Sequence, residues 1–336
     1  MRMISYIYEY LKKIGWIRRL VRSMGITSGS DWLFNKDFIL WMTKPYYKKQ
    51  LPISYKLFFV YCEIFGRLFK GKRIIFSRQI FWLASNIQKI IKTQTSFCIQ
   101  FDEYAAYLDL HDPLFLAIGY ELNEKDIMDK LSMFVHEGDT FIDVGANQGV
   151  YSVIASSLVG KSGMVVSVEP QPQLINNIEK SMVKNAFCKF QTLQMAVGNH
   201  NGEIDLIIPI NYSGIAGIYT EHSGTYRYRS LKVPIRKFDE AVKWEDFHGS
   251  VFLKLDIEGS EYAFLLGAEK MMRALKPMLL IEINSSSLKA SNTSLKDIVE
   301  FLLNVGYSQY RLLNDLNVIY SLDTLQIYEM RDVLIS

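Results

Sequence analysis

The sequence predicts an α/β protein with a mostly parallel central sheet, preceded by a basic helical module. Hydrophobic residues make up 49% and charged residues 22%, which is the balance of a folded globular protein. Beyond residue 140, short apolar runs alternate with stretches of helical periodicity, a pattern typical of a parallel sheet. The texture of the chain changes near Ser96. We therefore divide the 336 residues into a module at 1–95 and a domain at 96–336.

The module at 1–95 is predicted to contain several amphipathic helices. Apolar residues recur there at helical spacing, as in the stripe Ile4, Ile7, Tyr8, Leu11 and Ile14. It carries 18 Lys and Arg against 4 Asp and Glu, whereas the rest of the chain carries 20 against 31. This asymmetry favours contact with an anionic membrane surface, a phosphorylated glycan carrier or nucleic acid; a solvated helical face is the alternative.

The compartment expected from the sequence is the cytoplasm. The three cysteines show no pairing or zinc-ligand pattern, and the first 25 residues lack the apolar core of a secretory signal. The most apolar early stretch is interrupted by Lys56, Glu63 and Arg67 before it is long enough to span a bilayer. The module could still lie on the inner face of the membrane.

In the domain, the predicted strands and helices follow one another along the chain. Two short strands are expected at 97–101 and 106–110, before the alternating part begins. The later strands are expected at 140–144, 164–169, 190–197, 202–209, 251–258 and 278–283, with two terminal ones around 310–314 and 324–330. The intervening helices are expected from Gly149, from Pro172, and at 262–275 and 295–306.

The segment FIDVGANQGVYS predicts one half of a nucleoside site. A strand runs into Gly145, the chain turns, and Gly149 opens a helix. About twenty residues later Glu169 ends the next strand, where an acid can accept hydrogen bonds from both ribose hydroxyls. The turn lacks the second glycine of G-x-G-x-x-G and has Asn147 instead, which disfavours a dinucleotide. Asp143, inside the first strand, can help to hold a positively charged methionine end, so the pattern favours a sulfonium nucleoside.

From Gly119 to Ile283 the chain resembles the FkbM methyltransferase family. The matching segments are GYE, FIDVGANQGVYS, VEPQP, AVGNHNGEIDL, VPIRKFDE, LKLDIEGSE, GAEKMM and PMLLIEI, in that order. The resemblance implies a class I methyltransferase (Rossmann-like) fold, a seven-stranded sheet with its last strand antiparallel, and S-adenosylmethionine as methyl donor. It also implies a cofactor site in which Asp143, Gly145, Asn147 and Gly149 surround the methionine part, Glu169 holds the ribose, and Ala196 and Val197 border the adenine.

Asp256 and Glu258 are the first candidates for chemistry. They are two apart on an extended segment at the end of the fourth strand of the core, so both can face the same side, and one could remove the acceptor's proton. Asp256 ranks before Glu258, and Glu282 ranks third. Alternatively the pair orients the cofactor amine or binds a divalent cation, which two acids alone indicate only weakly, or Glu258 caps the next helix or pairs with Lys254.

His222 lies in a Gly-, Ser- and Tyr-rich stretch at 209–235 that suits a lid over the acceptor, or is a plain surface loop. The five histidines form no metal-ligand cluster in the sequence.

By resemblance to the family, the expected reaction is O-methylation of a sugar, a surface glycan or a secondary metabolite. One rival is a nucleic-acid methyltransferase, suggested by the basic module. It is disfavoured because LDIEG stands where amino-methylating enzymes of that class have D/N-P-P-Y/F. The other rival is a scaffold protein that retains the nucleoside pocket without turnover.

Overall fold

The computed structural model describes Leu57 and residues 96–100, 104–109, 130–209, 213, 216–219, 228–313, 315–326 and 331–336. The chain divides into two compact units, Met1–Glu103 with Leu108–Lys125, and Tyr104–Tyr107 with Asp126–Ser336. The predicted module at 1–95 lies outside the described residues except at Leu57, so its helices and its boundary stay predictions. The two short strands are present as β1 (Ser96–Gln100) and β2 (Ala105–Asp109). No helix among the described residues is long and apolar enough to cross a membrane.

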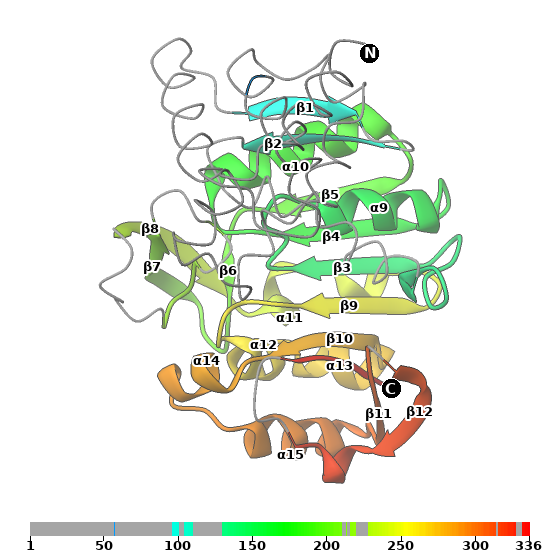
Figure 1. The fold of residues 1–336 in the computed structure, drawn as a ribbon, viewed down its shortest axis with the longest axis vertical. Helices are drawn as coiled ribbons and strands as arrows, with labels where there is room; N and C mark the ends of the chain where they lie inside the picture. Colours follow the sequence, from blue (N-terminus) through cyan, green and yellow to red (C-terminus); the bar gives the residue numbers. More distant parts are fainter. Residues whose placement is uncertain are drawn as a thin grey trace, which may run out of the picture. The chain divides into compact units, whose positions relative to one another are not determined.

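The second unit is built on a twisted eight-stranded sheet with the order β12-β11-β13-β10-β9-β3-β4-β5 (Figure 1). The strands from β5 to β10 run parallel, and β13 is antiparallel to both of its neighbours. Their bounds are β3 Thr140–Val144, β4 Met164–Val168, β5 Lys189–Leu193, β9 Val251–Leu255, β10 Met278–Ile283, β11 Gln309–Leu312, β12 Asp315–Ser321 and β13 Arg331–Ile335.

The predicted parallel sheet with an antiparallel last strand is therefore confirmed, and β12 adds an eighth strand to the seven expected. Of the two terminal strands, the first is present as β11, but the second is β13 rather than 324–330. The 3-10 helix η4 (Leu322–Thr324) stands at the start of that range, and residues 327–330 lie outside the described part. β12 was not predicted, because nearly all of its residues are exposed and no alternation of buried and exposed positions marks the strand.

Helices cover both faces of this sheet, and β3 and β9 are therefore buried at every position. α9 and α10 pack on each other, and α12, α13 and α15 form a second group. The bounds are α9 Val150–Val159, α10 Pro172–Asn185, α11 Phe238–Ala241, η3 Trp244–Asp246, α12 Glu261–Gly267, α13 Glu269–Leu275, α14 Ser285–Ala290 and α15 Leu295–Val305.

The carboxyl ends of the central strands end level with one another. Val144 at the end of β3 pairs with Val168 of β4 and with Leu255 of β9, and Val168 pairs in turn with Leu193 of β5. Segments that follow these strands therefore meet at one edge of the sheet, where open α/β sheets bind ligands.

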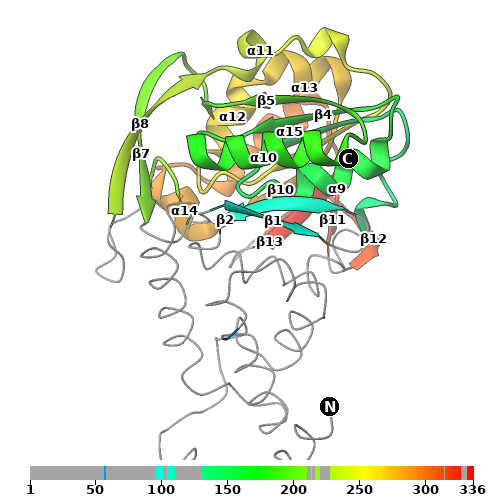
Figure 2. The ribbon, with the colours of Figure 1, turned by 90° about the horizontal axis from the view of Figure 1, so that it is seen from above.

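A separate three-stranded sheet lies beyond this edge, with the order β6-β8-β7 (Figures 1 and 2). Its strands are β6 Ala196–Val197, β7 Gly202–Pro209 and β8 Tyr228–Arg236, and β7 with β8 forms the predicted hairpin. The run 190–197 was predicted as one strand. It is divided instead between β5 and β6, which belong to different sheets, so the chain leaves the main sheet at Gln194 and Met195.

Candidate cofactor and acceptor site

The turn after β3 requires glycine at its first position. Gly145 has φ +78°, and a Cβ atom there would overlap the backbone oxygen of Asp256, which follows the neighbouring strand β9. Asn147 also has a left-handed φ of +49°, which asparagine tolerates better than most residues. The glycine therefore brings the turn against the LDIEG segment, and two regions that are far apart in the sequence form one wall.

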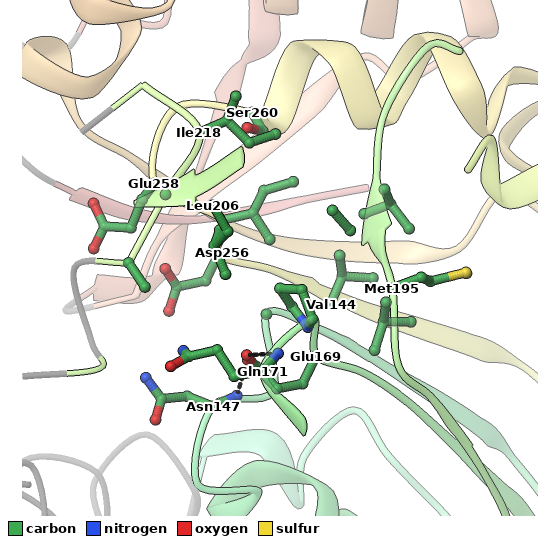
Figure 3. Close-up of a pocket in the computed structure, with 18 of the residues that line it drawn as sticks. Val144, Asn147, Glu169, Gln171, Met195, Leu206, Ile218, Asp256, Glu258 and Ser260 are labelled. Carbon is green, nitrogen blue, oxygen red and sulfur yellow. Dashed lines mark hydrogen bonds between the residues drawn. The ribbon is translucent and has the colours of Figure 1, made fainter. Parts of the chain in front are cut away.

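Glu169 holds this turn to the end of β4. Its carboxylate accepts hydrogen bonds from the backbone N–H of Asn147 (3.0 Å) and of Gln171 (2.9 Å), as Figure 3 shows. Burial raises the pKa of Glu169 to about 7, although these two N–H groups act in the opposite direction. A carboxylate has about four lone-pair sites, so Glu169 can still accept the ribose hydroxyls proposed for it.

A buried lysine links the two central strands behind the turn. Lys254 Nζ lies 3.1 Å from Asp256 Oδ2 and 3.9 Å from Asp143 Oδ1, and it stands over the ring of Tyr151 at 4.7 Å. Burial alone would lower the pKa of Lys254, but Asp256 and Asp143 together hold it above its usual value. Asp143 is fully buried, accepts a hydrogen bond from Ser152 Oγ (2.6 Å), and has its pKa raised by burial.

A cavity of about 90 Å³ opens along this wall, several times the space that one water needs. The predicted cofactor residues that line it are Gly145, Asn147, Glu169, Ala196 and Val197, and the predicted acids that line it are Asp256 and Glu258. Asp143, Gly149 and Glu282 are not among its lining residues. Asp143 therefore stands behind the wall, where it can act through Lys254.

The two ends of the cavity differ in character. Met195, Ala196 and Val197 make one end apolar and buried. Leu206 and Ser260 are buried residues that also line the cavity. Asp256 and Glu258 make the other end acidic and partly exposed. In Figure 3 the two acids lie together, on the opposite side of the view from Met195, and Ser260 lies beside Ile218.

Three of the predicted acids are brought together. Asp256, Glu258 and Glu282 each offer one oxygen, and these oxygens lie within 4.8 Å of one another. Burial, then Asp256 and Glu261, raises the pKa of Glu258 to about 7, whereas burial, then Asp256, Glu258 and Asp332, raises that of Glu282 to about 9. Asp332 pairs with Glu282 across β10 and β13, so the cluster includes like charges in directly opposed positions.

The turn that carries Glu258 is braced from within. Glu258 has a left-handed φ of +52° and Gly259 one of +97°. The buried Glu261 accepts hydrogen bonds at Oε1 from the backbone N–H of Ile257 (3.2 Å) and of Gly259 (3.1 Å). Ser287 Oγ donates to Glu258 Oε2 at 3.4 Å. The predicted cap by Glu258 on the next helix is not formed: α12 has Ser260 at its N-cap position and no side-chain hydrogen bond there.

The stretch at 209–235 contributes to the cavity at the points where it is described. Ser213 Oγ donates to Asn147 Oδ1 (2.9 Å), and Ala216, Gly217 and Ile218 line the cavity. His222, the predicted lid residue, lies outside the described residues. Sequence reasoning missed Ser213, Gln171, Lys254, Ser260 and Glu261. Lys254 had a legible signal, since it is the one charged residue within the buried run VFLKL.

The arrangement defines a class of protein. A parallel sheet with an antiparallel last strand, a glycine turn after the central strand and a buried acid after the next one form a class I S-adenosylmethionine-dependent methyltransferase fold. Residues 143–308 match the Methyltransferase FkbM domain. The chain belongs to the FkbM methyltransferase family.

Several solved structures are similar at low identity. Methyltransferase FkbM from Methylobacillus flagellatus has a TM-score of 0.37 and 17% identity over 59% of this chain and 43% of that one, so the chain spans less than half of it. TYW2 from M. jannaschii in complex with AdoMet has a TM-score of 0.40 and 10% sequence identity, over 73% of this chain and 85% of that one. Fibrillarin from Aeropyrum pernix with bound S-adenosyl-L-methionine has a TM-score of 0.33 and 14% sequence identity, over 60% of this chain and 67% of that one. None of the curated proteins matches the chain.

Proposed function

We propose that this methyltransferase transfers the methyl group to oxygen, and that the acceptor is a hydroxyl of a sugar, a surface glycan or a secondary metabolite. The observation that carries the proposal is Glu258, a carboxylate at the acidic end of the cavity with a pKa raised to about 7. A hydroxyl must lose its proton as it is methylated, and a base with a pKa near the working pH removes that proton most effectively.

The residues of the cavity fit S-adenosylmethionine. Glu169 retains lone pairs for a ribose, and the apolar end suits a flat base. When bound there, S-adenosylmethionine supplies a methyl group on positively charged sulfur. Lys254 fixes Asp256 beside the glycine turn, and Glu258 accepts the proton of the acceptor hydroxyl as its oxygen becomes methylated. Holding the two reactants in line supplies much of the rate.

This interpretation changes the order of the two acids. The sequence ranked Asp256 before Glu258, but Asp256 is engaged by Lys254 at 3.1 Å. Glu258 forms no ion pair with a lysine or arginine among the described residues, and the hydrogen bond that it accepts from Ser287 Oγ is long, at 3.4 Å. We therefore assign the proton-accepting role to Glu258, whose pKa is raised by burial and by the neighbouring carboxylates of Asp256 and Glu261.

The test is formation of S-adenosylhomocysteine from S-adenosylmethionine with panels of hydroxyl and amine acceptors. We expect turnover with a hydroxyl acceptor that falls by about 10²-fold or more in Glu258→Gln, with the affinity for S-adenosylhomocysteine kept. Glu300→Gln, at an exposed acid on α15, is the matched control. Turnover restricted to amines, or full activity of Glu258→Gln, would contradict the proposal. A folded wild type that binds cofactor but methylates nothing would favour the scaffold alternative.

A divalent cation is the second candidate for the acidic cluster, and the three converging oxygens favour it. Oxygen ligands of this kind suit Mg²⁺ or Mn²⁺, which would lower the pKa of an acceptor hydroxyl. Dialysis against a chelator followed by addition of Mg²⁺ or Mn²⁺ separates the two mechanisms. Activity that survives the chelator supports Glu258 as the base.

For the basic module at 1–95 we propose peripheral contact, at the inner face of the cytoplasmic membrane, with anionic lipid or a phosphorylated carrier. The support is its charge of 18 basic against 4 acidic residues and its aromatic content. Co-sedimentation of the full chain with anionic and with neutral vesicles tests it. Binding to oligonucleotides with a steep salt dependence, and none to vesicles, would favour the nucleic-acid alternative.

A further inference from the structure

Ser260 is a buried serine without a hydrogen-bond partner. It is 3% exposed, and its Oγ has no partner in the described part of the chain. An unpaired buried hydroxyl destabilises a protein by about 1–3 kcal/mol relative to a paired one. Such a group is uncommon in a folded protein and calls for a physical reason.

Local structure does not use this hydroxyl. Ser260 occupies the N-cap position of α12, where a serine normally accepts a hydrogen bond from the first turn of the helix. It forms no side-chain cap here. The backbone N–H groups of Ile257 and Gly259 in the adjacent turn are taken by Glu261. The hydroxyl is therefore left available to a group outside the protein.

The cavity offers that group a place. Ser260 lines it together with Met195, Val197, Leu206 and Ile218, and Figure 3 shows Ser260 beside Ile218. Among the described residues that line the cavity, Ser260 is the one with a buried hydroxyl that has no hydrogen-bond partner. A ligand that fits an apolar slot and also needs a hydrogen bond at its edge is a flat heterocycle.

We propose that Ser260 hydrogen-bonds the adenine of S-adenosylmethionine and of S-adenosylhomocysteine. This assignment rests on the proposed use of the cavity by that cofactor. The buried lining residues, Ser260 among them, suit the base, which needs no solvent contact, and the partly exposed acids suit the acceptor, which must enter and leave at every turnover. Glu169, the ribose acid, lines the same cavity. Ser260 thus supplies specificity for the base.

The structure predicts that Ser260→Ala has opposite effects on stability and on binding. Without ligand, the variant loses a hydroxyl that has no partner, so its melting temperature should stay equal or rise. With ligand, it loses a hydrogen bond, so its affinity for S-adenosylhomocysteine should fall by about 3- to 10-fold. Its ligand-induced rise in melting temperature should be correspondingly smaller.

Ser156→Ala is the matched control. Ser156 is equally buried, at 1% exposure, but its Oγ donates to the carbonyl of Val153 inside α9, and it does not line the cavity. Its replacement should leave the affinity unchanged. A structural role would move the melting temperature down in both variants, so the pair separates the two roles.

The experiment is calorimetric titration of wild type, Ser260→Ala and Ser156→Ala with S-adenosylhomocysteine and with 5′-deoxy-5′-methylthioadenosine, which keeps adenine and ribose but lacks the amino-acid part. The same loss for both ligands in Ser260→Ala supports the assignment. A loss confined to S-adenosylhomocysteine, unchanged affinities, or a lower melting temperature of the unliganded variant overturns it while leaving the proposed function intact. A folded wild type that binds neither ligand contradicts the proposed function itself.

Discussion

Glu169 is a buried acid whose protonation state sets how many hydrogen bonds it can accept. Its two oxygens already bind the backbone of Asn147 and Gln171, and its pKa is raised to about 7. Ribose hydroxyls that donate to it favour the ionised form. We therefore expect affinity for S-adenosylhomocysteine to fall by about 10-fold from pH 8 to pH 6, with proton release on binding at pH 7. Calorimetry in buffers of different ionisation enthalpy measures both.

The variant Glu169→Gln identifies the titrating group. Glu258 and Glu261 also have pKa values raised to about 7, so a pH dependence alone would not name the residue. Glutamine at 169 should weaken binding at every pH and remove its variation between pH 6 and pH 8. A variant that keeps the variation of the wild type would show that another acid is responsible.

Lys254 is the cation that compensates Asp143. We expect Lys254→Met to lower the free energy of unfolding by about 3–5 kcal/mol at neutral pH, because it leaves Asp143 buried without an opposite charge. The deficit should shrink as the pH falls and Asp143 gains a proton. Denaturant titration measures it, with Lys237→Met as control, since Lys237 pairs with Glu240 on the surface. Equal losses in both variants would contradict a special role for the buried pair.

At this scale, the sequence revealed the residues whose roles are local. Gly145 and Glu169 could be predicted because a glycine turn after a strand and an acid after the next strand are patterns within one βαβ unit. Ser260 and Glu261 could not, because their importance depends on which backbone groups a buried side chain reaches. Lys254 is recognisable as a charge within a buried run, but its partner Asp143 depends on which strands become neighbours. His222 and its lid stay predictions.

Among the elements, the turn after β9 combines strain with function. Glu258 has a left-handed φ of +52°, where a side chain costs roughly 1–2 kcal/mol compared with glycine. Two variants separate this strain from the charge: Glu258→Ala removes the carboxylate and keeps the Cβ, and Glu258→Gly removes both. We expect the glycine variant to be the more stable by about 1 kcal/mol in denaturant titration, after allowance for its greater unfolded-state entropy.

Both variants should lack methyl transfer, because both lack the proposed base. An alanine variant at least as stable as the glycine variant would mean that the turn is not strained in solution. A more stable glycine variant would instead show that the turn keeps its functional side chain at a cost in stability.

The alternation of apolar runs and helical stretches was enough to predict the parallel sheet, since it reflects burial on both faces. The same pattern gave a wrong prediction where one apolar run is divided between two strands. Residues 190–197 look like one strand, yet the chain changes sheets at Gln194 and Met195, and this break lets β6 and the hairpin border the cavity. Apolarity records burial, and it does not record the sheet in which a residue is buried.

For the whole molecule, the acids around the cavity tie stability to pH. Glu169, Glu258 and Glu261 have pKa values raised to about 7, and Glu282 one raised to about 9, with burial as the main cause. A raised pKa means that the folded chain keeps a proton that the unfolded chain releases above about pH 4.5. Raising the pH therefore favours unfolding, and the stabilisation is lost as the pH rises through the folded pKa values.

Glu282 should contribute the most lasting part of this effect between pH 7 and pH 9, because the other three acids are half ionised at pH 7 and lose most of their remaining protons by about pH 8. One retained proton lowers the free energy of unfolding by about 1.4 kcal/mol per pH unit over that interval. We expect Glu282→Gln to flatten the decline seen in the wild type, and Glu300→Gln, at an exposed acid, to leave it unchanged. Denaturant titrations at pH 6, 7, 8 and 9 give the slopes. Parallel slopes for wild type and Glu282→Gln would mean that a cation or a neighbouring group neutralises Glu282 in solution. That result would favour the mechanism in which the acidic cluster binds a divalent cation.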